Sequence, residues 1–425
     1  MIFLFDLFLE KRLNLIMQKS IIGILIISSL LLSACNNSVP SPIPKVKIND
    51  EIHNVKVKPI DLVQKKVDSM SLDEKIGQLV IVGMDGYTIN NNITNLIKQH
   101  KVSGVILFRK NVENSNQLLS LINSIKINNS LNKAPLFVSV DEEGGRVSRM
   151  PYEIKELPSN QIIGNKNNPD LSYNIGKIIG EELKTYGFNM DFAPVLDINS
   201  NPNNPIIGDR SFGNNAKIVS KLGIKTMKGI SNNNIIPVVK HFPGHGDTSV
   251  DSHVGLPLVS KDLKTLNNFE LLPFKEAIKN NADAIMVAHI LLNKIDNSNP
   301  ASMSKLVITD ILRKKLKFNG VVITDDMTMA AIIKYNDIGD AAIKSFNAGS
   351  DIILVCHEYN NELKVINSLK AAVQSKTISE KRLNDSVYRI LKLKEKYKIN
   401  NDMLNTINTN KINRINNKIK SFSNY

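Results

Sequence analysis

The sequence predicts an α/β protein in which one large domain, residues 61–400, forms a closed (β/α)8 barrel of the TIM type. Three observations predict it. Eight short runs rich in Val and Ile recur along the chain, a stretch long enough for a helix separates each run from the next, and polar residues follow most of the runs directly. A chain of 425 residues can hold such a barrel, which commonly takes about 250 residues, together with appended segments.

The eight runs are the expected strands of the barrel. Nearly continuous apolar strands that alternate with helices indicate a parallel sheet covered on both faces. Periodicity alone leaves an open, doubly wound sheet as the alternative, but eight successive units favour a closed barrel. The expected strands cover residues 79–82, 104–108, 136–140, 190–195, 236–239, 284–288, 320–323 and 351–355.

Two helices have clear signals in the sequence. Ser71 to Glu74 has the form of a capping box, which predicts a helix start just before the first strand. Residues 379–396, beyond the last strand, predict a helix with one apolar face. The residues on that face are Leu383, Val387, Ile390 and Leu391.

The N-terminal segment predicts export and a lipid anchor. An apolar run over residues 21–32 follows Lys19, is too short for a comfortable membrane span, and ends in Leu-Ser-Ala before Cys35. This pattern is typical of a lipoprotein signal peptide, residues 1–35, whose last cysteine receives the lipid. The alternatives are an uncleaved anchor and a structural cysteine after a chance apolar stretch, and Met17 is a second possible start. We therefore expect a lipoprotein on the outer face of the cell membrane, or on an outer membrane if the cell has one.

The segments on either side of the barrel are expected to be irregular. Residues 36–60 carry Pro40, Pro42 and Pro44 among polar residues and predict a flexible tether. The Asn/Lys-rich tail, residues 401–425, is expected to be disordered, with a short docking helix as the alternative. The only other cysteine is Cys356, so no disulfide within the chain remains once Cys35 is lipidated.

The composition narrows the possible partners. The formal net charge of +14 comes from scattered lysines without an arginine-rich block or interleaved aromatics, which argues against a nucleic-acid partner. Tryptophan is absent, so a carbohydrate site would lack its stacking surface. We expect a monomer.

Polar residues follow six of the eight expected strands. Because a barrel gathers the carboxyl ends of its strands on one face, we expect these side chains to converge on a common mouth. They are Asp141, Asp197, Lys240 with His241, His289, Asp325 and His357.

The densest group of candidate residues is the His loop, residues 240–253. Pro243, Gly244 and Gly246 exclude a helix, so His241 and His245 lack the continuous helix of an HExxH zinc site. Farther along, Asp251 precedes His253 by two residues, and such a carboxylate could orient the imidazole and stabilise its protonated form for acid–base catalysis.

Asp325 stands where a barrel strand delivers a nucleophile or a base. Its neighbour Asp326 fits better as the cap of the following helix.

These residues resemble the β-N-acetylglucosaminidases of glycoside hydrolase family 3. The similarity extends over about residues 67–398, and its most specific part is the His loop. The matching motifs are VDEEGGRV at residues 140–147, FAPVLD at 192–197, GDRSF at 208–212, KHFPGHG at 240–246 with DSH at 251–253, and TDDM at 324–327.

The resemblance implies a role for each matched position. Asp325 takes the position of the nucleophile that forms a covalent glycosyl-enzyme, and His253, paired with Asp251, takes that of the acid/base. It also implies a retaining mechanism without a metal or other cofactor. The positions that bind the terminal N-acetylglucosamine (GlcNAc) are Asp141, Arg149, Arg210, Lys240 and His241.

Many relatives draw an acid/base glutamate from a second domain. Here too few residues follow the eighth strand for such a domain, so we expect a single catalytic domain with the acid/base in the barrel. The resulting hypothesis is a β-N-acetylhexosaminidase acting on GlcNAc-containing glycan, either cell-wall fragments or chito-oligosaccharides.

Three alternatives stay open at this point. The first is a phosphorylase on the same fold, because a histidine acid/base does not repel phosphate. The second is a metal-dependent barrel hydrolase, and the third is a sugar-binding lipoprotein without activity. The histidines available to a metal would be His241, His245, His253 and His289.

Overall fold

The computed structural model describes residues 60–252 and 255–422. The predicted signal peptide with Cys35, the tether up to residue 59, and His253 lie outside the described residues. The described chain from Ile60 onward is one compact unit.

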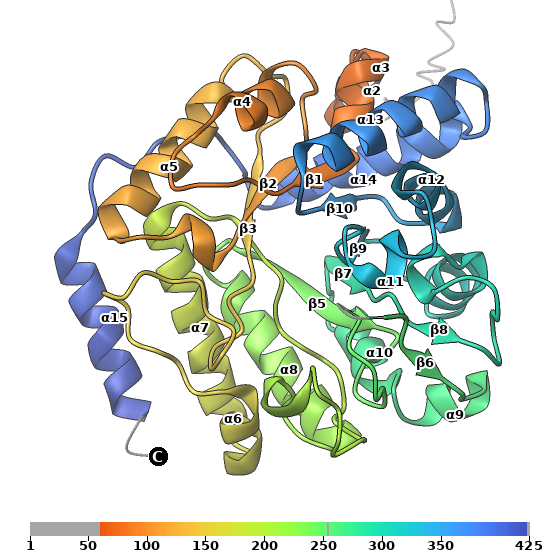
Figure 1. Cartoon of the computed structure of the whole chain (residues 1–425). Helices are drawn as coiled ribbons and strands as arrows, with labels where there is room; N and C mark the ends of the chain where they lie inside the picture. The colour runs from red at the N-terminus through yellow and green to blue at the C-terminus, as the bar shows by residue number, and fades with distance from the viewer. Residues whose placement is uncertain (1–59, 253–254, 423–425) are drawn as a thin grey trace, which may run out of the picture. The chain divides into compact units, whose positions relative to one another are not determined.

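Eight parallel strands form one sheet in the order β10-β1-β2-β3-β4-β5-β7-β9 (Figure 1). The two edge strands also meet, because Ile323 of β9 forms a parallel bridge with Ile352, and the N–H of Thr324 donates to the Ile352 carbonyl at 3.0 Å. The ring is thus completed, which confirms the predicted barrel. The strands are β1 Val80–Val82, β2 Gly104–Leu107, β3 Phe137–Val140, β4 Met190–Asp191, β5 Ile236–Phe242, β7 Ala284–Val287, β9 Val321–Thr324 and β10 Ile353–Val355.

All eight expected strands are present, and only β4 and β5 differ from their expected lengths by more than two residues. β4 stops at Asp191 rather than at residue 195, and Pro194 in the missing part has no N–H to donate to a ladder. β5 runs on to Phe242 and so carries Lys240 and His241 within the strand.

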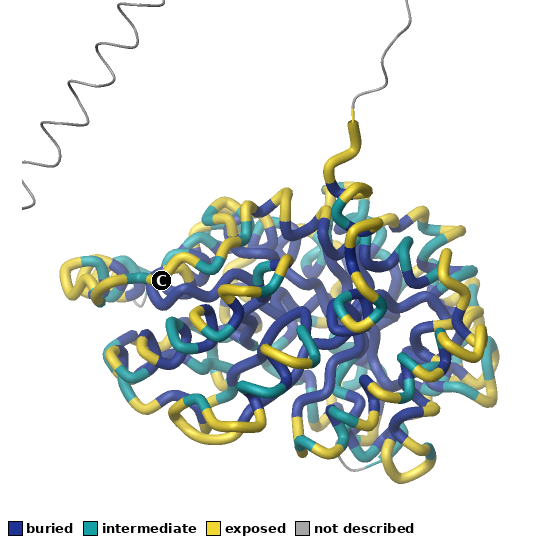
Figure 2. The backbone as a smooth tube through the Cα atoms, turned by 90° about the horizontal axis from the view of Figure 1, so that it is seen from above, coloured by how far each residue is buried: buried dark blue, intermediate teal, exposed yellow. Residues whose placement is uncertain are grey.

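Helices surround the barrel, and Figure 2 shows the buried backbone inside and the exposed residues on the outer surface. Between the strands lie α4 Asn91–Lys98, α5 Ser115–Asn128, α6 Asn160–Lys166, α7 Pro169–Tyr186, α8 Ala216–Ser231, α9 Leu263–Asn268, α10 Leu272–Lys279, a π-helix over Leu306–Lys315, α11 Ala330–Ile333 and α12 Ile338–Ala348. The helices outside the strand series are α2 Leu62–Asp68, α3 Leu72–Gly77, α13 Tyr359–Gln374, α14 Glu380–Lys396 and α15 Thr409–Phe422. Short 3₁₀ turns and a two-stranded sheet, β6 Leu258–Val259 with β8 Leu291–Leu292, complete the loops.

Both helix predictions are confirmed. Helix α3 has the complete capping box, in which the N–H of Glu74 donates to Ser71 Oγ at 3.2 Å and the N–H of Ser71 donates to Glu74 Oε2 at 2.8 Å. Ser379 caps α14, and the four predicted apolar residues of that helix are buried.

Helices α7 and α8 pack closely because glycines face the partner helix. A methyl group added to Gly176 would lie 2.3 Å from the Thr226 carbonyl oxygen, and one added to Gly229 would lie 2.2 Å from that of Tyr173. Both distances are shorter than a van der Waals contact, so the packing requires glycine at these positions.

The prediction of a disordered tail is wrong for residues 401–422. Helix α15 buries Ile412, Ile415 and Ile419 and lies beside α7 (Figure 1). These isoleucines recur at helical spacing, so they form one apolar stripe that packing against the barrel removes from water. No helix in the described parts of the chain is long and apolar enough to cross a membrane.

Candidate active site

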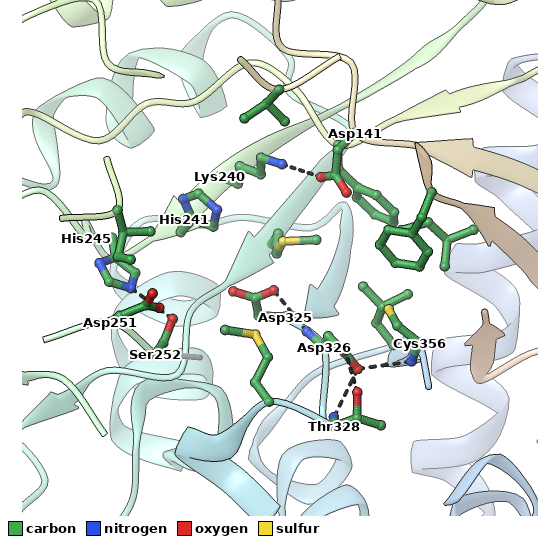
Figure 3. A pocket seen from close by; sticks show the side chains of 18 of the residues that line it. Asp141, Lys240, His241, His245, Asp251, Ser252, Asp325, Asp326, Thr328 and Cys356 are labelled. Carbon is green, nitrogen blue, oxygen red and sulfur yellow. Dashed lines mark hydrogen bonds and ion pairs between the residues drawn. The ribbon is translucent and has the colours of Figure 1, made fainter. Parts of the chain in front are cut away.

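A pocket of about 630 Å³ opens at the carboxyl ends of the barrel strands (Figure 3). The barrel brings together every predicted site residue that the structure describes, while His253 and Cys35 lie outside the described residues. The predicted residues that line the pocket are Asp141, Arg149, Arg210, Lys240, His241, Asp251 and Asp325.

Asp325 lies directly after β9 and points into the pocket (Figure 3). Its own N–H donates to the Val287 carbonyl of β7 at 2.9 Å, and its Oδ1 accepts the N–H of Asp326 at 2.9 Å. Burial raises the pKa of this carboxyl, but the imidazoles of His289 and His241 and the Asp326 N–H lower it by more. The net pKa lies below its usual range, so Asp325 is an anion at neutral pH.

Lys240 and Arg210 form the cationic side of the pocket, and Glu143 joins them. Lys240 Nζ lies 2.5 Å from Asp141 Oδ1 and 2.8 Å from Glu143 Oε1. Arg210 contacts the same glutamate through two parallel bonds, Nε to Oε2 at 2.8 Å and Nη2 to Oε1 at 2.7 Å. Both charges of Glu143 and Lys240 are buried, so the group is held together by charge-assisted bonds in a medium of low polarity.

The charges of this group support one another. Burial alone would raise the pKa of Glu143, but Arg210 and Lys240 hold it well below the usual range. Burial alone would lower the pKa of Lys240, but Asp141 and Glu143 raise it above the usual value. Glu143 and Lys240 are therefore charged at neutral pH, and the group can present fixed donors and acceptors to the hydroxyl groups of a sugar.

Asp197 orients the imidazole ring of His241. The Nδ1 atom of His241 lies 2.6 Å from Asp197 Oδ2, and its Nε2 lies 3.4 Å from Arg210 Nη2. Asp197 is fully buried, and although burial raises the pKa of its carboxyl, the interactions with the His241 and His245 rings and the His245 N–H lower it by more. Asp197 thus acts through His241 and does not line the pocket.

The His loop turns at the edge of the pocket. The N–H of His245 donates to Asp197 Oδ1 at 2.6 Å, and burial, with His241 nearby, lowers the pKa of His245 to about 4. His245 is thus neutral at physiological pH. Ser252 fixes the far part of the loop, because its carbonyl accepts the N–H of Ala331 at 3.1 Å. Asp251 beside it lies in the pocket wall with Asp325 (Figure 3).

Asp326 does not cap the following helix as predicted, because α11 begins after Met329 and has no side-chain cap. It fixes the turn before that helix instead. Its Oδ1 accepts the N–H groups of Thr328, at 2.9 Å, and Cys356, at 3.0 Å, and its Oδ2 accepts the Thr328 hydroxyl at 2.6 Å. These bonds fix the turn after β9 and, with it, the carboxylate of Asp325.

The two remaining strand-end histidines differ in location. His289 is buried behind the pocket, between Ser302 Oγ at 2.7 Å and the Asp326 carbonyl at 2.9 Å. His357 lines the pocket and stacks on Phe108, with ring centroids 5.4 Å apart.

Sequence reasoning missed Glu143 and Phe108 as parts of the site. Glu143 adjoins Glu142 in the sequence, and nothing there shows which of the two faces Lys240. Glu142 turns the other way, where its Oε2 accepts the N–H of Arg149 at 2.7 Å and the Ser148 hydroxyl at 3.0 Å. Burial raises the pKa of Glu142 to about 7.

Within residues 60–252 and 255–422, no group of three or more His, Cys, Asp or Glu side chains is arranged to hold a metal ion.

The comparisons with known proteins agree with this geometry. The family described as "Glycosyl hydrolase family 3 N terminal domain" matches residues 71–393. Beta-hexosaminidase A of Pseudoalteromonas piscicida is 38% identical over 333 residues, which are 73% of this chain and only 56% of that relative. A beta-hexosaminidase of Nitrosomonas eutropha is 34% identical over 303 residues, 69% of this chain and 86% of the relative.

Solved structures give the same result. A glycoside hydrolase family 3 β-N-acetylglucosaminidase from Paenibacillus sp. str. FPU-7 superposes with a TM-score of 0.78 at 38% identity, over 82% of this chain and 69% of that one. The family match extends over most of the chain and contains every pocket residue predicted from the sequence, which confirms the resemblance. The chain therefore belongs to the glycosidases of glycosyl hydrolase family 3.

Proposed function

We propose that the protein is a retaining β-N-acetylhexosaminidase that removes terminal β-linked GlcNAc from the non-reducing end of glycans. The observation that carries this proposal is the position of Asp325. It is an ionised, partly buried carboxylate in a pocket that Lys240 and Asp141 line across from it (Figure 3), together with Arg210. That side offers hydrogen bonds to a sugar ring, and Asp325 faces the point where the anomeric carbon would then lie.

The proposed reaction has two steps. In the first, an oxygen of Asp325 attacks the anomeric carbon, the glycosidic bond breaks, and the leaving oxygen takes a proton from His253. In the second, His253 takes a proton from water, the water oxygen attacks the anomeric carbon, and the Asp325 carboxylate leaves. We propose that Asp251 orients His253, because it precedes His253 by two residues and lies in the pocket wall with Asp325.

The substrate is proposed to be a cell-wall fragment or a chito-oligosaccharide. The lipoprotein signal ending at Cys35 supports this proposal, because an exported enzyme would meet such glycans outside the cell membrane. The names of the relatives, beta-hexosaminidases and a β-N-acetylglucosaminidase, support the sugar specificity.

Product analysis tests the proposal. Purified protein is incubated with chito-oligosaccharides and with cell-wall fragments, each with and without inorganic phosphate, and products are followed by NMR. We expect free GlcNAc released first as the β-anomer, at a rate that phosphate does not change. GlcNAc 1-phosphate would establish a phosphorylase instead, the α-anomer as first product would exclude retention, and no release from any β-GlcNAc substrate would refute the proposal.

A further inference from the structure

Arg149 reaches the pocket from a long loop, residues 141–158, which we call the Arg149 loop. The inner part of this loop is fixed by hydrogen bonds between its own residues. The N–H of Gly145 donates to the Leu157 carbonyl at 3.0 Å, and the N–H of Glu143 donates to the Val147 carbonyl at 2.9 Å. Beyond Arg149, the outer part over residues 150–156 runs across the surface of the barrel. Its position must be fixed by contacts with other elements.

One such contact comes from the C-terminal helix α15. Asn416 Nδ2 donates to the Glu153 carbonyl at 2.8 Å, and Asn416 Oδ1 accepts the N–H of Lys155 at 2.8 Å. A single side-chain amide thus pairs with the backbone on both sides of Ile154, in the way that a neighbouring strand would. Ile154 itself is buried, so the two bonds hold a loop segment that already contacts the core.

Helix α15 can hold the loop because it is itself fastened to α7. Its three buried isoleucines supply the apolar contact, and Lys418 forms an ion pair of 2.6 Å with Glu181 of α7. A second contact fixes the same loop segment to α5. The N–H of Ser115, at the start of that helix, donates to Glu153 Oε1 at 3.0 Å. The outer part of the Arg149 loop is thus fixed to two helices of the barrel.

We propose that α15 braces the substrate-binding loop, and that Asn416 is a positioning residue which acts on the sugar site through Arg149. This inference rests on the proposed function in so far as Arg149 binds the sugar. Helix α15 lies beyond residue 393, where the family match ends, so the brace is a feature of this chain outside the matched domain. Without these bonds the loop samples more conformations, and binding has to select the one in which Arg149 reaches the pocket.

The test compares two neighbouring asparagines of α15. Asn416→Ala removes both bonds, whereas Asn417→Ala changes an exposed side chain that has no hydrogen-bond partner in the described chain. For a nitrophenyl β-GlcNAc substrate, we expect Asn416→Ala to raise KM roughly 3- to 10-fold with kcat within about twofold of wild type, because the two bonds act on binding alone. Asn416→Asp keeps the acceptor for Lys155 and should give an intermediate KM.

Hydrogen exchange supplies a readout that does not need activity. The N–H of Lys155 donates to Asn416 Oδ1, so its exchange should accelerate in Asn416→Ala, stay slow in Asn416→Asp, and match wild type in Asn417→Ala. Wild-type KM and wild-type Lys155 exchange in a folded Asn416→Ala protein would overturn the proposal. If wild type releases no GlcNAc, the proposed function fails, while the exchange of Lys155 still decides whether the brace exists.

Discussion

Asp325 and Asp326 are adjacent carboxylates at the end of one strand, yet their surroundings give them different tasks. Both line the pocket, but the carboxylate of Asp326 accepts the N–H groups of Thr328 and Cys356, whereas Asp325 accepts, within the described chain, only the N–H of Asp326. The carboxylate of Asp326 is thus engaged in fixing the turn, which leaves Asp325 as the proposed nucleophile.

Replacing Asp325 by Asn keeps the shape of the side chain and removes its charge. We expect Asp325→Asn to lower kcat by about 10³-fold or more, with GlcNAc binding largely retained, because the proposed nucleophile is lost and the Lys240 side of the pocket is untouched. Steady-state kinetics and calorimetric titration with GlcNAc measure the two effects. A slow fluoro-sugar inactivator should label Asp325, and peptide mapping that located the label on Asp326 would contradict the assignment.

The role of Glu143 in the pocket could not be predicted from the sequence. Its partners Lys240 and Arg210 lie far along the chain, 97 and 67 residues away by number, so only the fold shows that it joins them. We expect Glu143→Gln to lower the free energy of unfolding by about 3–5 kcal/mol, because it leaves the buried Lys240 and the partly buried Arg210 with one compensating charge fewer. Chemical denaturation measures this change. Glu156→Gln, at an exposed position of the same loop, is the matched control, and equal midpoints for both variants would show that Glu143 is not needed for compensation.

At the scale of elements, the sequence predicts the helices and strands whose apolar residues recur with a regular period. Eight Val/Ile-rich runs, the capping box at Ser71 and the apolar face of α14 were all readable, because strand and helix periodicities act within a few residues. The apolar stripe of α15 was present in the sequence too, but its isoleucines stand among many Asn and Lys residues, and the partner surface on α7 is created only by folding. The candidate site was predictable where a polar residue follows a strand, and it was missed where a residue acts through a partner distant in sequence.

The contact between α7 and α8 offers a test of packing at this scale. We expect Gly229→Ala to lower the free energy of unfolding by about 1–3 kcal/mol, because the added methyl group would meet the Tyr173 carbonyl and force the helices apart. Thermal unfolding followed by circular dichroism measures the effect. Lys221→Ala, at an exposed position of α8, should leave the midpoint nearly unchanged. A Gly229→Ala protein as stable as wild type would mean that the helices can separate without cost.

At the scale of the whole molecule, the barrel places its strand ends, and therefore its chemistry, on one face. The chain preceding Ile60 has a different task in the proposed function, since Cys35 would carry the lipid that holds the enzyme at a membrane. The anchor and the barrel can be tested separately, because the pocket residues all belong to the barrel.

Anchoring is tested by Cys35→Ala. We expect the protein to move from the detergent phase to the aqueous phase in a two-phase partition, since a lipid chain contributes about 0.8 kcal/mol per buried CH₂ to membrane binding. Activity on soluble substrates should stay at the wild-type level. A variant that still entered the detergent phase would show that the apolar run at residues 21–32, and not a lipid, holds the chain there.

The stacked pair of Phe108 and His357 in the pocket wall has a practical consequence, because the chain contains no tryptophan. Its ultraviolet fluorescence comes from tyrosines alone. An indole placed at position 108 by Phe108→Trp would be the single long-wavelength emitter of the protein, in contact with an imidazole that quenches when protonated and beside the space a sugar would occupy. Binding of a sugar should then change the fluorescence of this indole, so binding could be followed in real time without a chromogenic substrate.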